Sequence, residues 1–600
     1  MIATMDPVTQ TDQAGHPYEF GGAAENPSIV TALAVVSALV GSGVSDFAYC
    51  PGSRNAPFAY VLAQLEAEGL VRVHPFVEER GAGFWAIGAM KASPSTLVAV
   101  VTTSGTAVAE LHPAVIEARH QGLPLVVVTA DRPFEAHLVG ANQTTNQVGI
   151  FAGAPVAEVN VPALGTDTDS ELVRKLHRRV QRAIMLAKGI PGLPGPAHIN
   201  VALREPLVPA DPRFLGEVAS LVSQDSGPVP VARPSQTPWS AVVDPSLRTL
   251  LVVGDAEGSS DKNDVRLLAT HGAELGIPMI AEPSSGVTDL PNWLPHGPLI
   301  ADRLARGVQQ LVVLGRPTLS RALGRLMRTQ NVRKVVVGNT ADWSDESGTA
   351  TVYVDRLRPD PSDDAGLRSG DLSESDLDEE KQDHRQWLQF CTKAAGDAES
   401  VVAEISGAED DLNHLSAVRT IWDASTDIAL WLGASNTIRA FDLAAAGRGV
   451  RFAYSNRGLA GIDGTIASSL GLQSGLGMPV RAVMGDLTFC YDLPSLAARP
   501  DGEQNIQVIV FDDGGGSIFS SLEHGTAANK ATYDKFFGVR QHIEPCVVAE
   551  GCGWSTRRIS TMEELRGAVG EPVVGRSLLQ VRLPVPAEMI RALNKAAADL

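Results

Sequence analysis

Short apolar runs recur along the chain and alternate with segments of helical periodicity. Residues 97–101 and 125–128 are almost wholly Val, Leu and Ala, which is typical of strands buried on both faces of a parallel sheet. Each run ends in small or polar residues, at 102–106 and 129–132. Because parallel sheets bind ligands at the carboxyl ends of their strands, these segments are candidate binding loops.

The same pattern continues to the C-terminus. Asn26-Pro27 predicts the start of a helix over 29–40 that Gly41 closes. Further strands are expected at 249–253, 311–314 and 334–337, each followed by a glycine, and at 428–432, 480–484 and 506–511. The sequence therefore predicts an α/β protein with mainly parallel sheets flanked by helices.

Breaks in this pattern predict three domains. Proline-rich stretches at 205–209 and 227–230 mark one boundary, and the acidic run within 359–383 is expected to be a solvated linker. We expect a flexible leader over 1–25, an N-terminal domain over 26–205, a central α/β domain over 206–358 and a C-terminal domain over 384–600.

Composition limits the function classes. The 600 residues carry a formal net charge of −20, which argues against a general nucleic-acid or anionic-membrane role. No signal peptide or membrane-spanning run is evident, so no membrane insertion is expected. The five cysteines form no Cys-x-x-Cys pair and are odd in number, which favours a reducing cytoplasm over a disulfide framework or zinc site.

Two aspartates at predicted strand ends suggest a metal site. Asp486 follows Gly485 at the end of strand 480–484, and Asp513 follows strand 506–511 with Gly515 and Gly516 behind it. Two carboxylates, a backbone oxygen and phosphate oxygens suit the oxygen shell that Mg²⁺ prefers. The alternative is that each aspartate only caps a turn or helix, its commoner use at strand ends.

Several segments together carry a family resemblance. They are Pro51-Gly52-Ser53-Arg54-Asn55, the stretch 103–109, Thr129-Ala130-Asp131-Arg132-Pro133, Gly140-Ala141-Asn142-Gln143, and Ser455-Asn456-Arg457-Gly458. With the Gly-Asp pair at 485–486, the chain resembles the MenD family of menaquinone-pathway synthases within the thiamine-diphosphate-dependent enzymes. The resemblance implies the thiamine-diphosphate-binding fold, with a pyrimidine-binding N-terminal domain and a C-terminal domain that binds the diphosphate and metal.

Cofactor residues follow from the resemblance. Thiamine diphosphate would be held by Gly485, Asp486, Leu487, Asp513, Gly515 and Gly516, through Mg²⁺ or Mn²⁺ on Asp486, Asp513 and Gly515. Two positions depart from the generic motif of this superfamily. Leu487 replaces the last glycine of Gly-Asp-Gly, in agreement with the MenD subgroup. The paired asparagines are replaced by Asp512-Asp513-Gly514, in which Asp513 adds a negative charge near the metal. Ile462 matches the bulky residue that bends the cofactor, although ordinary core packing is the alternative.

A catalytic glutamate is also implied. In this superfamily a glutamate hydrogen-bonds N1' of the cofactor's aminopyrimidine. The family pattern places it directly before arginine and selects Glu79 in Val77-Glu78-Glu79-Arg80, while Glu78 is expected to form a surface ion pair. Burial should raise the pKa of such a glutamate.

The implied reaction is decarboxylation of 2-oxoglutarate and 1,4-addition of the resulting succinyl carbanion equivalent to isochorismate, giving 2-succinyl-5-enolpyruvyl-6-hydroxy-3-cyclohexene-1-carboxylate. Both substrates are dicarboxylates, which arginine binds bidentately. Arg439 and Arg457 would hold the 2-oxoglutarate carboxylate, with Ser435 near the reacting carbon. Isochorismate would be bound by Ser53, Arg54, Arg132, Asn142 and Gln143. The pocket would be completed by Arg321, Ile518 and Phe519. For Ile518 and Phe519, core packing is the alternative.

Superfamily precedent places each active site between subunits, so a homodimer or homotetramer is expected. Two other functions stay open on the sequence. The motifs also fit an acetolactate synthase or another 2-oxo acid decarboxylase, and the glycine run 471–477 could belong to a nucleotide-binding regulator.

Overall fold

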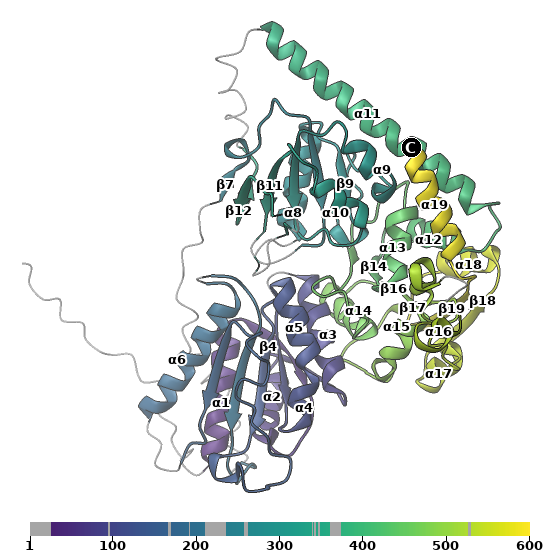
Figure 1. The fold of residues 1–600 in the computed structure, drawn as a ribbon. Coiled ribbons are helices and arrows are strands. Elements are labelled where there is room, and N and C mark those ends of the chain that lie inside the picture. Colours follow the sequence, from purple (N-terminus) through teal and green to yellow (C-terminus); the bar gives the residue numbers. More distant parts are fainter. Residues whose placement is uncertain are drawn as a thin grey trace, which may run out of the picture.

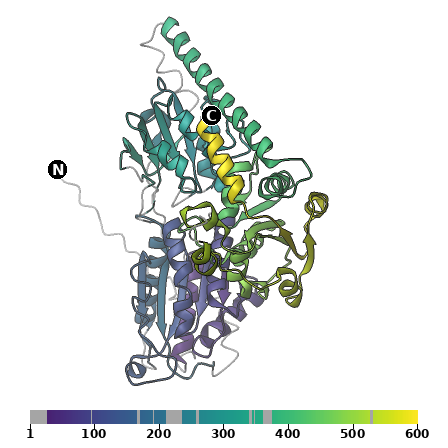
Figure 2. The ribbon, with the colours of Figure 1, turned by 45° about the vertical axis from the view of Figure 1, so that its right-hand side comes forward.

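The computed structural model describes residues 26–600 except 94–95, 166–169, 191, 210–235, 257–261, 339, 341–343, 346–347, 361–373 and 526–529. The leader at 1–25 therefore lies outside the described residues. Three parallel sheets of six, five and six strands form the framework, and helices flank each sheet (Figures 1 and 2). The α/β prediction is confirmed.

The N-terminal sheet has the order β2-β1-β3-β4-β6-β5 with every pair parallel. Its strands are β1 (Val44–Tyr49), β2 (Arg72–Pro75), β3 (Leu97–Thr102), β4 (Val126–Asp131), β5 (Ala157–Val161) and β6 (Ala197–Ala202). Its helices are α1 (Pro27–Gly41), α2 (Ala56–Ala67), α3 (Glu79–Ala92), α4 (Thr106–Glu110), α5 (His112–Gln121) and α6 (Ser170–Ala187), with a 3₁₀ turn η2 (Phe134–Ala136). The Asn26 side chain caps α1 by accepting hydrogen bonds from the N–H groups of Ser28 and Ile29, as the sequence predicts.

The central sheet has the order β12-β11-β10-β8-β9. Its strands are β8 (Thr249–Val253), β9 (Met279–Ala281), β10 (Gln310–Leu314), β11 (Arg333–Val337) and β12 (Val352–Val354), and β7 (Thr237–Pro238) pairs separately with β13 (Leu357–Arg358). The helices here are α8 (Lys262–Glu274), α9 (Gly297–Leu304) and α10 (Arg321–Met327), with the 3₁₀ turns η4 (Trp239–Ala241) and η5 (Pro283–Ser285).

The C-terminal sheet has the order β15-β14-β16-β17-β19-β18, again parallel throughout. Its strands are β14 (Ala429–Leu432), β15 (Ala453–Tyr454), β16 (Val480–Gly485), β17 (Ile506–Asp512), β18 (Ser555–Ile559) and β19 (Arg576–Arg582). Helices α11 (Glu374–Ser406), α12 (His414–Asp423), α13 (Asn436–Ala444), α14 (Thr465–Leu476), α15 (Asp486–Tyr491), α16 (Lys530–Phe536), α17 (Pro545–Gly551), α18 (Met562–Gly570) and α19 (Ala587–Asp599) surround it, with the 3₁₀ turns η7 (Leu493–Leu496), η8 (Ser517–Ser521) and η9 (Glu523–Gly525).

The N-terminal and C-terminal domains meet where α3 packs against α14 (Figure 1). Glycines permit this close approach: a Cβ at Gly88 would lie 1.9 Å from the carbonyl oxygen of Ser468, and one at Gly471 would lie 1.9 Å from that of Trp85. The glycine run 471–477 thus belongs to a helix that packs against another helix. The nucleotide-loop reading of that run is wrong.

The segment expected to be an acidic linker is partly structured. Helix α11 begins at Glu374, inside 359–383, while 361–373 lie outside the described residues. The run Glu379-Glu380-Lys381-Gln382 consists of good helix formers, and Asp383 forms an ion pair with Arg248 at 3.3 Å. The run of acidic residues therefore resembles a linker although it contains the start of a helix.

None of the described helices is both long enough and apolar enough to cross a bilayer.

Candidate active site

The predicted site residues lie at the carboxyl edges of the three sheets. In the N-terminal domain the segments after β1, β2, β3 and β4 carry Arg54, Glu79, Ser104 and Arg132. In the C-terminal domain Ser435, Arg457, Asp486 and Asp513 follow β14, β15, β16 and β17. The parallel topology places each set at a single edge of its sheet.

Asp486 connects two strand ends of the C-terminal sheet. It is the first residue of α15 and is buried. Its Oδ2 accepts a hydrogen bond from the N–H of Gly515 at 2.7 Å, and its Oδ1 accepts one from the N–H of Leu487 at 2.7 Å. Burial, reinforced by the negative charge of Asp513, raises the pKa of Asp486 to about 6. Two carboxylates thus lie close enough together to repel each other.

The glycines beside Asp513 have conformations that a side chain would disturb. Gly515 has φ +114°, and a Cβ there would lie 2.1 Å from the carbonyl oxygen of Gly538. The N–H of Gly516 donates to that same oxygen at 2.7 Å. The loop is therefore held against the 537–538 segment, and its backbone can lie close to a ligand.

This arrangement fits a divalent cation with a diphosphate. A cation between Asp486 and Asp513 would offset the Asp513 charge, which adds to the effect of burial on the pKa of Asp486, because opposite charge favours the ionised carboxylate. Carboxylates, a backbone oxygen of the glycine loop and phosphate oxygens make the all-oxygen shell that Mg²⁺ or Mn²⁺ accepts. One further neighbour was not predicted: Nε2 of His414 lies 3.2 Å from Oδ2 of Asp513.

A cluster of arginines lies beside this loop. The Asn436 side chain donates to Oγ of Ser517 at 2.9 Å, which joins the start of α13 to the residue after Gly516. One turn along α13, Arg439 donates to the carbonyl oxygen of Ser435 at 2.8 Å. Burial, with the positive charges of Arg457 and Arg321, lowers the pKa of Arg439. The structure therefore brings three of the five predicted arginines into one electrostatic cluster, Arg321 of the central domain included.

Hydrogen bonds to two other domains fix Arg457 and the two residues that follow it. Its Nη2 donates to Oγ1 of Thr318 in the central domain at 3.0 Å. The N–H groups of Gly458 and Leu459 donate to the Glu117 carboxylate of α5 at 2.8 and 2.7 Å. The loop after β15 is consequently fixed between the N-terminal and central domains.

Two buried carboxyls near these arginines were not predicted. Glu282 follows β9, is fully buried and accepts a hydrogen bond from the N–H of Leu319 at 2.6 Å. Burial raises the pKa of Glu282 to about 7 although the Arg457 charge opposes the shift. Burial also raises the pKa of Asp442, and the Glu282 charge adds to that shift. Asp442 stands three residues after Arg439 on α13, a spacing that could have indicated it.

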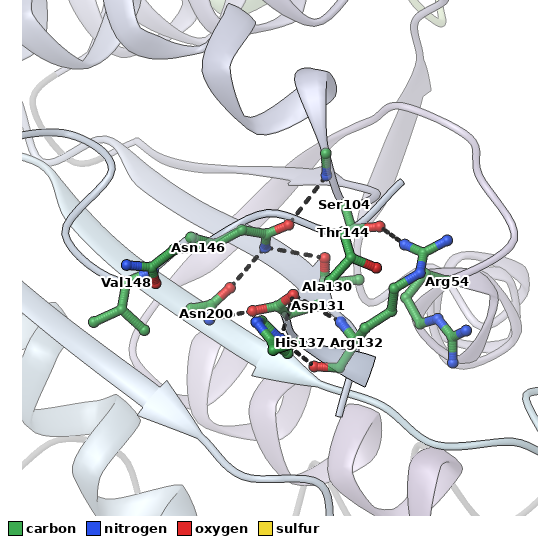
Figure 3. A network of polar contacts seen from close by, with 12 residues as sticks. Arg54, Ser104, Ala130, Asp131, Arg132, His137, Thr144, Asn146, Val148 and Asn200 are labelled. Atoms are coloured by element: carbon green, nitrogen blue, oxygen red, sulfur yellow. Dashed lines mark hydrogen bonds and ion pairs between the residues drawn. The ribbon is translucent and has the colours of Figure 1, made fainter. Parts of the chain in front are cut away.

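The N-terminal edge holds a second basic cluster (Figure 3). The Arg132 guanidinium donates to Oγ of Ser104 and, at 2.7 Å, to the carbonyl oxygen of Gln143. The Gln143 side chain returns a hydrogen bond to the carbonyl oxygen of Ser104 at 2.9 Å. Burial, with the nearby charge of Arg54, lowers the pKa of Arg132. Arg54 itself donates to the carbonyl oxygen of Leu203 at 2.9 Å.

A polar network underneath orients this cluster. Gln147 accepts from the N–H of Gly105 at 3.1 Å and donates to Oδ1 of Asn200 at 2.8 Å, and Asn200 donates to Asp131 at 3.0 Å (Figure 3). Ser53 and Asn142 lie exposed on the same loops as Arg54 and Gln143. Their side chains face solvent at the edge where a ligand would arrive.

Glu79 is the first residue of α3 and is partly buried. Burial raises its pKa, and the negative charges of Glu78 and Glu110 add to the shift, in the direction that a proton-donating glutamate needs. Glu78 has a different role: it caps α3 by accepting from the N–H of Gly81 at 2.7 Å and pairs with Arg80 at 3.5 Å.

The remaining predicted residues are apolar. Ile462 lies half-buried in the loop between β15 and α14, and Leu487 lies half-buried in the first turn of α15. Ile518 and Phe519 are half-buried on η8, and the Phe519 ring lies 5.4 Å from that of Phe537. Phe519 therefore packs against Phe537.

The comparisons with known proteins agree with this geometry. A family model described as "Thiamine pyrophosphate enzyme, N-terminal TPP binding domain" matches residues 30–150. We call residues 512–516, which contain Asp512 and Asp513, the acidic loop. The fold, the acidic loop and this match define the chain as a thiamine-diphosphate-dependent enzyme. Relatives named 2-succinyl-5-enolpyruvyl-6-hydroxy-3-cyclohexene-1-carboxylate synthase extend the likeness over nearly the whole chain.

The relative from Paenarthrobacter aurescens is 35% identical and covers 94% of this chain and 95% of its own length. The relative from Clavibacter michiganensis is 36% identical, with 93% and 96% covered, and the one from Mycobacteroides abscessus is 33% identical, with 93% and 97% covered. The chain belongs to the family of 2-succinyl-5-enolpyruvyl-6-hydroxy-3-cyclohexene-1-carboxylate synthases.

Proposed function

We propose that this enzyme decarboxylates 2-oxoglutarate and adds the succinyl carbanion equivalent to isochorismate in a 1,4-addition, as the name of its family indicates. The observation that carries the proposal is the pair of basic clusters, one at the C-terminal domain beside the acidic loop and one at the N-terminal edge. Two separate basic clusters on a chain of net charge −20 suit two dicarboxylate substrates.

Thiamine diphosphate would supply the carbanion stabilisation that decarboxylation requires. Asp486, Asp513 and the backbone oxygen of Gly515 would hold its metal ion, Mg²⁺ or Mn²⁺, and Gly485, Leu487 and Gly516 would line the diphosphate. Ile462 would support the bent cofactor, since its β-branched side chain is stiff. Glu79 would hold a proton at the aminopyrimidine ring.

The substrates would divide between the two clusters. Arg439 and Arg457 would bind the carboxylate of 2-oxoglutarate, with Ser435 next to the reacting carbon and Ile518 and Phe519 excluding water. Isochorismate would be bound by Ser53, Arg54, Arg132, Asn142 and Gln143, with Arg321 contributed by the central domain.

A coupled assay tests the activity. With thiamine diphosphate, Mg²⁺ and both substrates, isochorismate should disappear in step with CO₂ release, and the product should carry both carbon skeletons. Isochorismate that persists while 2-oxoglutarate is consumed would instead make the chain a simple 2-oxo acid decarboxylase.

Arginine-to-lysine substitutions should separate the two substrates. Lysine keeps the charge but loses the bidentate fork, so Arg457→Lys should raise KM for 2-oxoglutarate by about tenfold or more with little effect on KM for isochorismate. Arg132→Lys should show the reverse pattern. Steady-state kinetics with each substrate varied in turn measures the split, and equal effects of both variants on both substrates would contradict it.

We propose further that two copies of the chain share each active site. Apolar side chains lie uncovered at the N-terminal edge: Val77 is 95%, Phe134 90% and Leu138 104% exposed. An apolar surface of this kind beside a site suits a partner subunit.

Complementation tests this arrangement. Glu79→Gln and Asp486→Asn should each be inactive, but a mixed dimer of the two would contain one site with both native residues. Co-expression should therefore restore about a quarter of the wild-type activity by random pairing. No recovery in isolated mixed dimers would place both residues in the same chain's site.

A reducing cytoplasm is the proposed location. Cys50, Cys391, Cys490, Cys546 and Cys552 all lie in the part of the chain that the structure describes, and all five are free thiols. Free thiols persist where glutathione and thioredoxin keep them reduced.

A further inference from the structure

One region of this acidic chain is strongly basic. Residues 172–204 contain seven Lys and Arg and no Asp or Glu, although acidic residues outnumber basic ones 69 to 49 in the whole sequence. Much of this basic charge belongs to helix α6, which lies at the periphery of the N-terminal domain, away from the central and C-terminal domains (Figure 1). Neither basic cluster of the active site includes a residue of α6.

Helix α6 has two distinct faces. Its apolar residues, Val173, Leu176, Val180 and Ile184, are buried towards the sheet and α1. Arg174, Arg178, Arg179 and Arg182 are exposed on the opposite side, at spacings that keep them on one helix face.

These four arginines keep their charge available. Arg178 donates to the neutral side chain of Gln181 at 2.7 Å, and none of the four forms an ion pair with a described residue. Other cations nearby are already engaged: Lys175 pairs with Glu171 at 2.6 Å, Lys188 donates to the carbonyl oxygen of Ser42 at 2.6 Å, and Arg204 pairs with Glu135 at 2.7 Å. We call the four arginines the α6 basic face.

An apolar hollow adjoins this face. A hollow of about 600 Å³ opens between α6 and β5, an edge strand of the N-terminal sheet. Its lining combines Val161, Pro162, Leu164 and Leu176 with Arg174, Arg178 and Arg179. Positive charges therefore rim a mainly apolar depression, a combination that suits an amphiphile with an anionic head.

The net charge of the protein does not cancel this local field. At physiological ionic strength charges are screened beyond about 8 Å. A charged surface that approaches α6 therefore interacts mainly with the charges of α6 and its immediate neighbours. The nearest acidic side chains in the sequence are Asp167, Asp169 and Glu171, all before the first arginine. A surface that carries regularly spaced negative charge would therefore be attracted to this side of the molecule.

We propose that the α6 basic face docks on the surface of an anionic phospholipid bilayer, with the arginines on lipid phosphates and the hollow accepting apolar lipid atoms. A cluster of exposed basic residues is attracted to the negative charge of such a surface. A nucleic acid would not use the apolar hollow, and residues 160–182 offer no Phe, Trp or Tyr for base stacking. The docking is peripheral and reversible, and the catalytic site takes no part in it.

Vesicle co-sedimentation of the full-length protein tests the proposal. At 50 mM salt the protein should bind vesicles of phosphatidylcholine with 30% phosphatidylglycerol and leave pure phosphatidylcholine vesicles unbound. Each cation at such a surface contributes about fivefold in affinity, so Arg174→Glu/Arg178→Glu/Arg182→Glu should weaken binding by at least about 100-fold. The matching triple lysine variant should retain it, because charge and not shape is required.

The control reverses the same amount of charge elsewhere. Arg306, Arg448 and Lys595 are exposed on the central and C-terminal domains, and changing all three to Glu should leave vesicle binding within about twofold. Unchanged turnover in the α6 triple variant would show that the helix still folds. Wild-type protein that stays in the supernatant, or an α6 variant that binds as well as wild type, would overturn the proposal.

Two other outcomes would also overturn it. Duplex DNA that competes fully with vesicles and binds more tightly than they do would assign the face to a polynucleotide. A change in oligomeric state on sedimentation of the α6 variant would assign it to a second copy of the chain.

Discussion

Asp486→Asn should abolish metal-dependent binding of thiamine diphosphate. The amide keeps the size of the side chain and can still accept the N–H of Gly515, which Asp486 binds at 2.7 Å, but it removes the charge that a divalent cation needs. We expect Mg²⁺-dependent cofactor affinity to fall by at least about 100-fold and turnover to be lost. Calorimetric titration of thiamine diphosphate with and without Mg²⁺ measures the effect independently of activity.

Asp512→Asn is the matched control. Asp512 ends β17 one residue before Asp513, and its Oδ2 accepts a hydrogen bond from Gln580 at 2.7 Å. The same change of charge at the same strand end should leave cofactor affinity within a few-fold, because this side chain faces Gln580 and Arg582. Equal losses in both variants would mean that general electrostatics, and not coordination by Asp486, governs binding.

Much of the fold could be predicted because its strands are short, apolar and closed by glycine. The expected strand 249–253 coincides with β8 (Thr249–Val253), and the expected strand 480–484 differs from β16 by one residue. Parallel strands that are covered by helices on both faces of the sheet give this continuous apolar pattern, because side chains on both faces are buried. Strand ends in turn located Asp486 and the glycine loop, since a parallel sheet brings successive carboxyl ends together.

The rest of the site depends on contacts between domains, which no local pattern encodes. Glu282 follows β9, whose three residues Met279–Ala281 are too short to give a periodic signal. The proximity of Arg321 to Arg439 arises only when the carboxyl edges of the central and C-terminal sheets face each other. The start of α11 was missed for a different reason, because its acidic residues resemble a solvated linker.

The buried carboxyls explain how three arginines can share one region. Without compensation, the cluster of Arg321, Arg439 and Arg457 would repel itself. Glu282 and Asp442 lie among these charges, and each offsets an arginine charge when it is ionised. Burial raises the pKa of both carboxyls, so protonation of the pair leaves more positive charge for an incoming dicarboxylate.

Glu79→Gln should keep the cofactor and lose most of the turnover. The glutamine side chain has nearly the same shape but cannot release and regain a proton as a carboxyl does. Burial raises the pKa of Glu79, which favours the protonated carboxyl that donates a hydrogen bond. We expect kcat to fall by about 10²- to 10⁴-fold while the affinity for thiamine diphosphate stays within tenfold. Single-turnover kinetics at saturating cofactor separates the two effects.

Glu78→Gln is the control for that experiment, because it changes the same charge one residue away. Glu78 caps α3 through the N–H of Gly81 and pairs with Arg80, and a glutamine oxygen can still accept the capping hydrogen bond. Turnover should therefore fall by less than about tenfold. Near-normal turnover of Glu79→Gln together with a large loss in Glu78→Gln would transfer the proton-holding role to Glu78 and remove Glu79 from the mechanism.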